Sequence, residues 1–284
     1  MKKIIIHVGT HKTATSSFQR YCYKFRDILS ERGVCYPLIK GYENVNSHFL
    51  LARSLEQTSR ESAKSIMNNI FNEFNEDKNH TLLLSSEDFE NSLVGSEQLD
   101  HLMAAARKFK FNTFEAVIVA RRPYDYLFSI YSELSKQKTV LNFSEIAEAV
   151  IKYGYFVSTS SDFNYYFAIK TLLFAKRFAA RHPSMKVRYF NFTDFVTGFP
   201  GKPLLTSIIG SKATNLMERV GLKSELNNKK LEPFEVELNY AKNMFNLMPE
   251  DKDIPPDTMN LLTDIANKRL ALIHSLTKEL SARL

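Results

Sequence analysis

Tryptophan is absent from the 284 residues, and cysteine occurs only twice, as Cys22 and Cys35. Two isolated cysteines have no metal-site spacing and are too few for a disulfide framework, which favours a reduced intracellular setting. The chain also has no apolar run near the roughly 18 residues that a membrane span needs, so we expect no transmembrane helix. Lys2 and Lys3 precede only a short apolar stretch, Ile4 to Val8, which is too short for a signal peptide. We therefore expect a cytoplasmic protein.

Blocks of like charge are missing as well. The 38 Lys and Arg residues and 31 Asp and Glu residues give a net charge of +7, and the basic residues are scattered along the chain. A basic balance suits an anionic ligand. Scattered charges argue against a nucleic-acid-binding arm, and the 13 Tyr and 22 Phe form no RNA-binding signature. No nucleic-acid partner is expected.

What the chain does contain is an alternation of apolar strands and amphipathic helices. The apolar, β-branched runs that predict buried strands are residues 4–8, 81–86, 116–120 and 187–190. Helices are predicted over 15–32, 123–136, a long segment ending near 181, and 261–280, with further helical regions at 41–76 and 138–180. This order predicts an α/β fold of three layers, in which helices flank a mainly parallel central sheet and the C-terminal part is helical. We expect one domain spanning residues 1–284.

Parallel sheets bind ligands at the carboxyl ends of their strands, which directs attention to the loop after the first strand. Its residues are Gly9, Thr10, His11, Lys12, Thr13, Ala14, Thr15, Ser16 and Ser17. A loop between a strand and a helix presents backbone N–H groups to an anion, and here Lys12 adds a charge and the hydroxyl residues add donors. Ser and Thr at a helix start also serve as caps, but capping accounts for one of them only. The segment is not a Walker A loop, because no glycine precedes Lys12 directly.

A second candidate site follows the third predicted strand. Arg121 ends this strand, Pro123 stands where the first turn of a helix tolerates proline, and Ser129 lies about two turns further on. An Arg at a strand end and a Ser on the adjoining helix can hold one phosphate group between them. A solvated basic turn is the alternative interpretation of this segment when it is taken alone.

Together the two segments resemble those of sulfotransferases that use 3′-phosphoadenosine 5′-phosphosulfate (PAPS). In that family a strand, a loop with Lys and hydroxyl residues, and a helix bind the 5′-phosphosulfate, and an R-x-P-x(5)-S segment binds the 3′-phosphate. Arg121, Pro123 and Ser129 match the spacing of that segment. The likeness is greatest to bacterial enzymes whose chains open with a strand and an H-x-G-x-x-K-T loop. The motifs cover about 30 residues, and the order of strands and helices extends the likeness over roughly the first 200.

The resemblance implies a P-loop-NTPase-like sulfotransferase fold, PAPS as donor, adenosine 3′,5′-bisphosphate as product and no metal. Lys12 would contact the bridging and sulfuryl oxygens, and Arg121 and Ser129 the 3′-phosphate. The 5′ end would be held by Gly9, His11, Thr13, Ala14, Thr15, Ser16 and Ser17. The chain departs from the family at Arg122, where Asn is frequent. It also has no Trp to stack on adenine, a role left to Tyr155 or a Phe. Lys229 and Lys230 are candidates for the basic loop that closes over the nucleotide.

Sulfuryl transfer also needs a base for the proton of the acceptor hydroxyl. Glu87 follows the second predicted strand and therefore falls at the binding edge of the sheet, although it could simply cap or solvate the next helix. His48 begins a predicted helix and suits base chemistry near neutral pH, although it could hold a structural hydrogen bond. Both stay candidates.

Two other functions remain open from the sequence. A P-loop-type kinase shares the opening strand, loop and helix, and Asp88 would serve it as a metal-holding acid. A non-catalytic nucleotide- or polyanion-binding protein is the other. The acceptor is expected to carry a hydroxyl group, and a glycan is our guess. Aromatic residues between positions 153 and 166 would either stack on a sugar or pack in a core.

Overall fold

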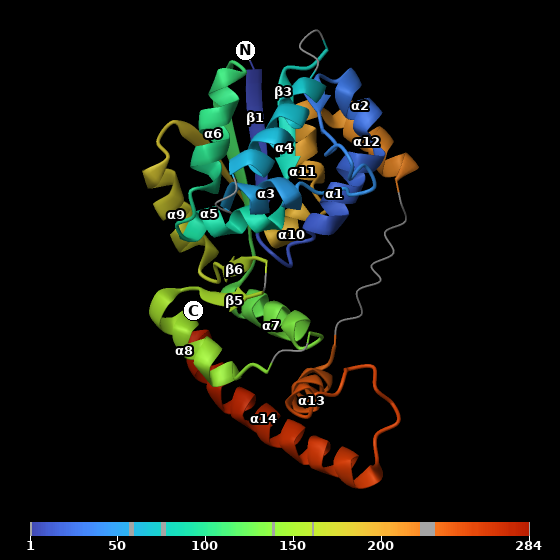
Figure 1. The fold of residues 1–284 in the computed structure, drawn as a ribbon, viewed down its shortest axis with the longest axis vertical. Coiled ribbons are helices and arrows are strands. Elements are labelled where there is room, and N and C mark those ends of the chain that lie inside the picture. The colour runs from blue at the N-terminus through green and yellow to red at the C-terminus, as the bar shows by residue number, and fades with distance from the viewer. Residues whose placement is uncertain are drawn as a thin grey trace. The chain divides into compact units, whose positions relative to one another are not determined.

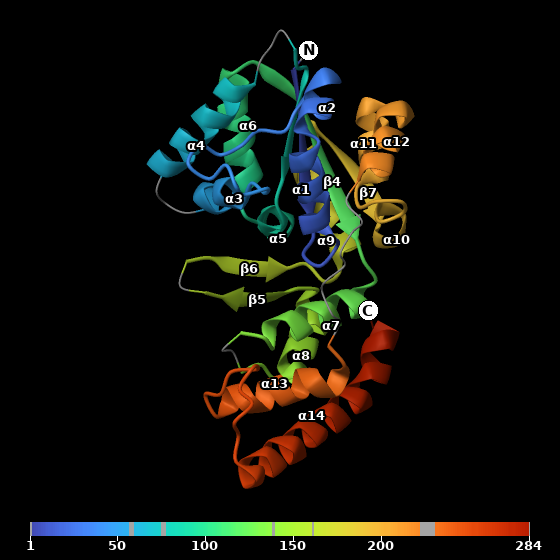
Figure 2. The same cartoon turned by 90° about the vertical axis from the view of Figure 1, so that its right-hand side faces the viewer.

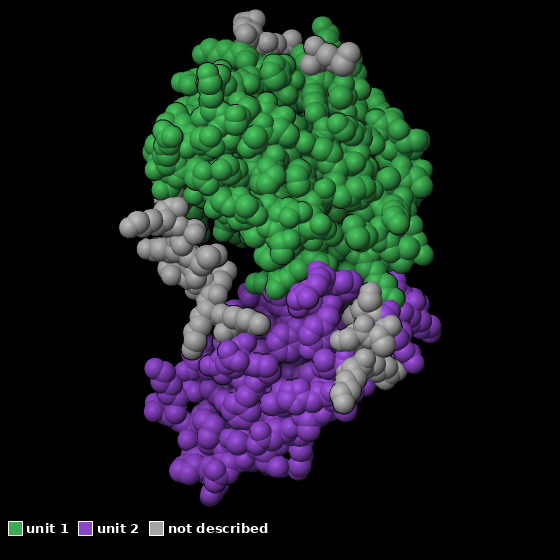
Figure 3. Space-filling model, turned by 180° about the vertical axis from the view of Figure 1, so that it is seen from behind, with its two compact units in different colours: residues 1–121, 157–225 green, residues 122–156, 226–284 purple. Residues whose placement is uncertain are grey.

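The computed structural model describes residues 2–56, 60–74, 78–137, 140–160, 162–221 and 231–283. The chain divides into two compact units (Figure 3). Unit 1 takes in the described residues of 1–121 and 157–225, and unit 2 those of 122–156 and 226–284. The single domain expected from the sequence stays a prediction.

Unit 1 is built around a five-stranded sheet in the order β2-β3-β1-β4-β7, of which Figure 1 labels β1 and β3. The strands are β1 (Lys2–Gly9), β2 (Val34–Cys35), β3 (Thr81–Ser85), β4 (Phe111–Ala120) and β7 (Met185–Asn191). Every neighbouring pair is parallel. The predicted α/β fold with a mainly parallel sheet is therefore confirmed.

Helices cover both faces of this sheet, which is why its central strands are apolar on successive residues. Ile4, Ile5 and Ile6 of β1 are all fully buried, as a strand between two helical layers requires. On one face Ile5 packs with Phe18 of α1 (Thr15–Lys24) and Leu205 of α11 (Lys202–Ile209). Figure 2 shows α6 (Gln98–Lys108) on the side of the strands away from α11.

The first predicted helix is two helices in the structure. α1 ends at Lys24 and α2 (Arg26–Glu31) follows, with Phe25 between them at a φ of −107°. The side chain of Phe25 is buried in the core, and its N–H still donates to the carbonyl of Tyr21 at 3.0 Å. The predicted span of 15–32 was therefore right in extent and wrong in continuity.

The region 138–180, predicted to be helical, contains a β-hairpin. α8 (Phe143–Tyr153) and α9 (Thr171–Arg181) are helices, but β5 (Phe156–Thr159) and β6 (Asn164–Phe167) form a two-stranded sheet between them. Side chains outside the hairpin bind its backbone: the N–H of Tyr166 donates to Oδ1 of Asn91 at 3.0 Å, and Nδ2 of Asn91 donates to the carbonyl of Asn164 at 2.7 Å. The prediction was wrong here because Asn91, which is distant in the chain, forms hydrogen bonds with the backbone of the hairpin.

In the region 41–76, also predicted to be helical, the first helix begins at Phe49.

The remaining described helices complete the two units. Those of unit 1 are α3 (Phe49–Glu56), α4 (Arg60–Glu73), the 3₁₀ helix η1 (Glu87–Glu90), α5 (Asn91–Val94), α10 (Phe192–Phe195) and α12 (Ser211–Val220). Unit 2 also holds α7 (Pro123–Leu134), α13 (Pro233–Met244) and α14 (Pro256–Arg283), which confirms the helical C-terminal part. The buried Glu237 of α13 joins this helix to α14, because its Oε2 accepts from Nε of Arg269 at 2.8 Å. Within the described ranges no helix is long and apolar enough to cross a membrane.

Gly201 is required by the core of unit 1, and its replacement tests that packing. A Cβ at this position, where φ is +85°, would lie 2.0 Å from Cδ2 of Phe18. We expect Gly201→Ala to lower the free energy of unfolding by about 2–4 kcal/mol, because strain and overpacking add. Gly41→Ala is the matched control: φ is also +85°, but nothing lies within 4 Å of the added Cβ. Urea denaturation should show a loss of only about 1–2 kcal/mol for the control. Equal losses would contradict the packing argument.

Candidate functional site

The order of the strands places a binding crevice at the carboxyl ends of β1 and β4. From β1 the chain turns toward β2 and β3, whereas from β4 it turns toward β7, so the direction of the connections reverses between these two neighbours. Open α/β sheets bind ligands at such a switch point. Gly9 ends β1 there, and Arg121 directly follows β4.

The loop from Thr10 to Ala14 is closed by its own hydroxyl groups. The carbonyl of Thr10 accepts from Oγ1 of Thr13 at 2.6 Å and from Oγ1 of Thr15 at 3.2 Å. The hydroxyl of Thr10 in turn donates to the carbonyl of Val119 in β4 at 3.1 Å. Thr13 and Thr15 are buried. Their side chains therefore shape the loop and fasten it to the sheet.

The start of α1 has no side-chain cap. Its N-cap residue is Ala14, which has no side-chain hydrogen bond and a left-handed φ of 62°. Lys12 is also left-handed, at φ 60°. Such conformations cost about 1–3 kcal/mol each in a non-glycine residue and are concentrated at functional sites. Backbone turns that contain left-handed residues can form concavities that bind anions, so this turn is a candidate anion site. Capping by Ser or Thr, the alternative raised by the sequence, is not what is observed at the N-cap.

Glu87 lies beside this loop. A Cβ on Gly9 would come 3.0 Å from Oγ1 of Thr15 and 3.8 Å from Cα of Glu87, so Glu87 lies close to the beginning of the loop. The side chain of Glu87 is half-buried, and its Oε2 accepts from Nε2 of Gln19 at 3.0 Å. The residue after β3 and the loop after β1 are thus brought together, as the sequence predicts for a parallel sheet.

His48 is placed differently from Glu87. Its side chain is buried, and both ring nitrogens contact main-chain groups. Nδ1 accepts from the N–H of Ser85 at 3.0 Å, and Nε2 donates to the carbonyl of Pro37 at 3.0 Å. Burial lowers the pKa of His48 to about 4. This arrangement is that of a neutral histidine holding two segments together.

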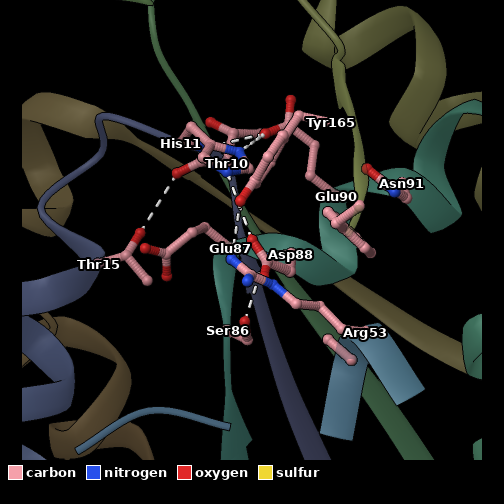
Figure 4. A network of polar contacts seen from close by, with 12 residues as sticks. Thr10, His11, Thr15, Arg53, Ser86, Glu87, Asp88, Glu90, Asn91 and Tyr165 are labelled. Carbon is pink, nitrogen blue, oxygen red and sulfur yellow. Dashed lines mark hydrogen bonds and ion pairs between the residues drawn. The ribbon is translucent and has the colours of Figure 1, made fainter. Parts of the chain in front are cut away.

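His11 belongs to a network of charged groups that the sequence did not reveal (Figure 4). Its backbone N–H and Nδ1 both donate to Oε2 of Glu90, at 2.9 and 2.7 Å, and Nε2 lies 3.6 Å from Oδ1 of Asp88. Burial alone would lower the pKa of His11, but the hydrogen bonds to Asp88 and Glu90 outweigh it and raise the pKa to about 10. His11 is therefore an imidazolium at neutral pH.

The network continues to α3 and to the hairpin. Nε of Arg53 donates to Oδ2 of Asp88 at 2.6 Å, and its NH2 group donates to the hydroxyl of Tyr165 at 2.8 Å. The other oxygen of Glu90 accepts from the N–H of Ala168 at 2.7 Å. The only sequence signal for these contacts was the acidic run directly after the second predicted strand. Arg53 and Tyr165 gave none.

Arg121 extends from the end of β4 to the loop from Thr10 to Ala14, which we name the anion loop after its predicted ligand. Its NH1 group donates to the carbonyl of Lys12 at 3.1 Å, and its guanidinium lies over the ring of Phe192 at 5.0 Å. The two sequence motifs therefore meet at this hydrogen bond. Ser129 belongs to α7 in unit 2, where it is half-exposed, and its predicted contact stays a prediction.

Other predicted positions are spread over the chain. Ser16 is exposed and Ser17 half-buried in the first turn of α1, and Tyr155 is half-buried in unit 2. Lys229 and Lys230 lie outside the described residues. In the part of the chain that the structure describes, no group of three or more His, Cys, Asp or Glu residues is arranged to hold a metal ion.

No protein-family model, curated protein or solved structure matches this chain.

Proposed function

We propose that the protein is a PAPS-dependent sulfotransferase with a P-loop-NTPase-like sulfotransferase fold. The observation that carries the proposal is the hydrogen bond from Arg121 to the carbonyl of Lys12 at the switch point of the sheet. It joins the loop that would hold the 5′-phosphosulfate to the arginine that would hold the 3′-phosphate. One ligand with an anionic group at each end fits this pair.

The residues present fit the donor. The backbone N–H groups at the start of α1 and the charge of Lys12 suit the phosphosulfate, and the guanidinium of Arg121 suits a phosphate. Bound PAPS would supply a sulfuryl group whose bridging oxygen takes up negative charge as its bond to sulfur breaks. Lys12 stabilises that charge, and Glu87 accepts the proton of the acceptor hydroxyl as the new sulfur–oxygen bond forms. The acceptor we propose is a glycan hydroxyl.

The surroundings of Asp88 support this proposal over the kinase. A metal-holding acid needs carboxylate oxygens directed to the ion, whereas Oδ2 of Asp88 accepts from Arg53 and Oδ1 faces His11. The lack of a glycine directly before Lys12 points the same way. The proximity of a carboxylate, Glu87, to the anion loop favours an enzyme over a binding protein.

Ligand-induced stabilisation tests the proposal. Adenosine 3′,5′-bisphosphate without metal, at about 100 times its dissociation constant, should add about 2.7 kcal/mol to the stability. For a chain of this size that corresponds to a rise in Tm of about 5–10 °C. Stabilisation by Mg-ATP alone would identify a kinase, and no response to either nucleotide would remove the proposed site.

The same assay on Arg121→Ala separates recognition from loop support. Losing one charge-assisted contact costs about 1.5–3 kcal/mol, so affinity for adenosine 3′,5′-bisphosphate should fall about 10- to 150-fold. Affinity for adenosine 5′-phosphate should change much less. Equal losses for both ligands would mean that Arg121 acts only by holding the carbonyl of Lys12. Arg122→Ala is the matched control, because the side chain of Arg122 is 86% exposed and pairs only locally with Asp125.

A further inference from the structure

A second concentration of charge lies at the opposite end of the sheet from the candidate site. There a cavity of about 210 Å³ is lined by strand residues, by His80 directly before β3 and by two residues of α11. Its lining residues are Lys3, Ile5, His80, Thr81, Glu115, Lys186, Arg188, Ser207 and Ile208. Lys3 stands at the beginning of β1 and Gly9 at its end, a separation of about 20 Å along an extended strand. The cavity is therefore distinct from the anion loop.

The register of the sheet shows how these charges are gathered. Glu115 in β4 lies opposite Ile5 of β1 and Lys186 of β7. In a parallel sheet, residues in register point to the same face, so Lys186 and Glu115 share the face on which Ile5 packs with Val117. On this face the apolar core gives way to a charged layer at the amino ends of the strands.

One buried carboxylate organises this layer. The side chain of Glu115 is only 1% exposed, and its oxygens are paired with Nζ of Lys3 at 2.5 Å and with Nε of Arg188. NH1 of Arg188 also donates to Oγ of Ser207 on α11 at 2.6 Å. These contacts fix the positions of two of the cationic side chains around the cavity.

The charges around the cavity do not balance. Three cationic side chains, Lys3, Lys186 and Arg188, face a single carboxylate, Glu115. Lys3 and Arg188 already offset the charge of Glu115, so Lys186 adds positive charge that no other carboxylate lining the cavity balances. Like charges gathered at a cavity raise the local concentration of anions and are stabilised by one.

We propose that this cavity binds a tetrahedral oxyanion with two negative charges, either free phosphate or the phosphate group of a small monoester. Two charges match the excess of positive charge. Arg188 presents a planar donor group and Lys186 a mobile point charge, the two forms in which proteins bind phosphate. The proposal does not depend on the proposed sulfotransferase activity.

Calorimetric titration of the full chain with inorganic phosphate, at ionic strength held constant with NaCl, tests the proposal. We expect saturable binding that Lys186→Ala weakens about tenfold and that Lys186→Arg largely retains. Lys186 is exposed, so these variants should fold. Lys212→Ala, at an exposed position on α12 outside the cavity, is the control for net charge and should bind like the wild type. Glycerol 3-phosphate, titrated in parallel, distinguishes the sources: tighter binding identifies a monoester as the ligand, and equal or weaker binding the free ion.

Three results would overturn the proposal. If phosphate shows no saturable binding, the charged side chains around the cavity form only a structural ion pair. Equal weakening by Lys186→Ala and Lys212→Ala would show that phosphate responds only to net charge. If Lys12→Ala weakens phosphate binding and Lys186→Ala leaves it unchanged, phosphate binds at the anion loop.

Discussion

Lys12→Ala should reduce turnover by at least about 10²–10³-fold, the usual loss when one group that stabilises developing charge is removed. Lys12 lies in the anion loop at a left-handed φ of 60°, where its ammonium group would meet the bridging oxygen of the donor. No other lysine occurs in the segment from Gly9 to Ser17 to replace it. The measurement is the rate of transfer from PAPS to an acceptor sugar, with circular dichroism to check the fold.

Lys110→Ala is the matched control for this variant. Lys110 also has a left-handed φ, 65°, and is exposed, so the same side chain is removed from the same kind of backbone. The two variants should differ little in stability and greatly in activity. Normal turnover in Lys12→Ala would remove the central claim of the mechanism, whatever the control does.

Glu87→Gln should have the second large effect, a fall in kcat of about 10²–10⁴-fold, as expected for a general base. The amide keeps the size of the side chain and its contact with Gln19 but cannot take up the proton. Affinity for adenosine 3′,5′-bisphosphate should stay nearly unchanged, because Glu87 has no part in holding the nucleotide. Steady-state kinetics and ligand titration on the same preparation separate the two quantities.

His48→Asn completes the comparison of the two candidate bases. Because both ring nitrogens of His48 contact the main chain, we expect this variant to lose stability, by about 1–3 kcal/mol, rather than catalysis. A large fall in kcat for His48→Asn, with Glu87→Gln little affected, would reverse the assignment. Losses under tenfold in both variants would mean that the proton leaves through water or another group.

The sequence predicted those parts of the fold that rest on local apolar pattern. The run Ile4 to Val8, apolar except for His7, predicted β1 because a strand covered on both faces is apolar on successive residues. β2 was not predicted, since its two residues, Val34 and Cys35, are too few for any periodicity and owe their conformation to pairing with Thr81 and Leu82. Likewise the hairpin depends on Asn91, which is distant in the chain from the backbone groups that it binds.

The candidate site was predictable to a similar degree. The motifs predicted the positions of the loop and of Arg121. Where a strand ends and a helix begins, the backbone between them has a defined place at the edge of the sheet. They did not show that the hydroxyls of Thr13 and Thr15 are used within the loop, since composition does not tell a donor to a ligand from a donor to the backbone. The pairing of His11 with Glu90 was also invisible, because it joins residues that only the sheet brings together.

Glu90 has a consequence for how the two sides of the site influence each other. One oxygen of this fully buried carboxylate holds His11 in the loop, and the other holds Ala168 at the end of the hairpin. A shift of either segment changes the hydrogen bonding of the other, so their conformational equilibria are linked through one side chain. Linkage of this kind is reciprocal. If the proposed donor binds at the loop, it would change the affinity for a ligand at the hairpin by some factor, and that ligand would change the affinity for the donor by the same factor.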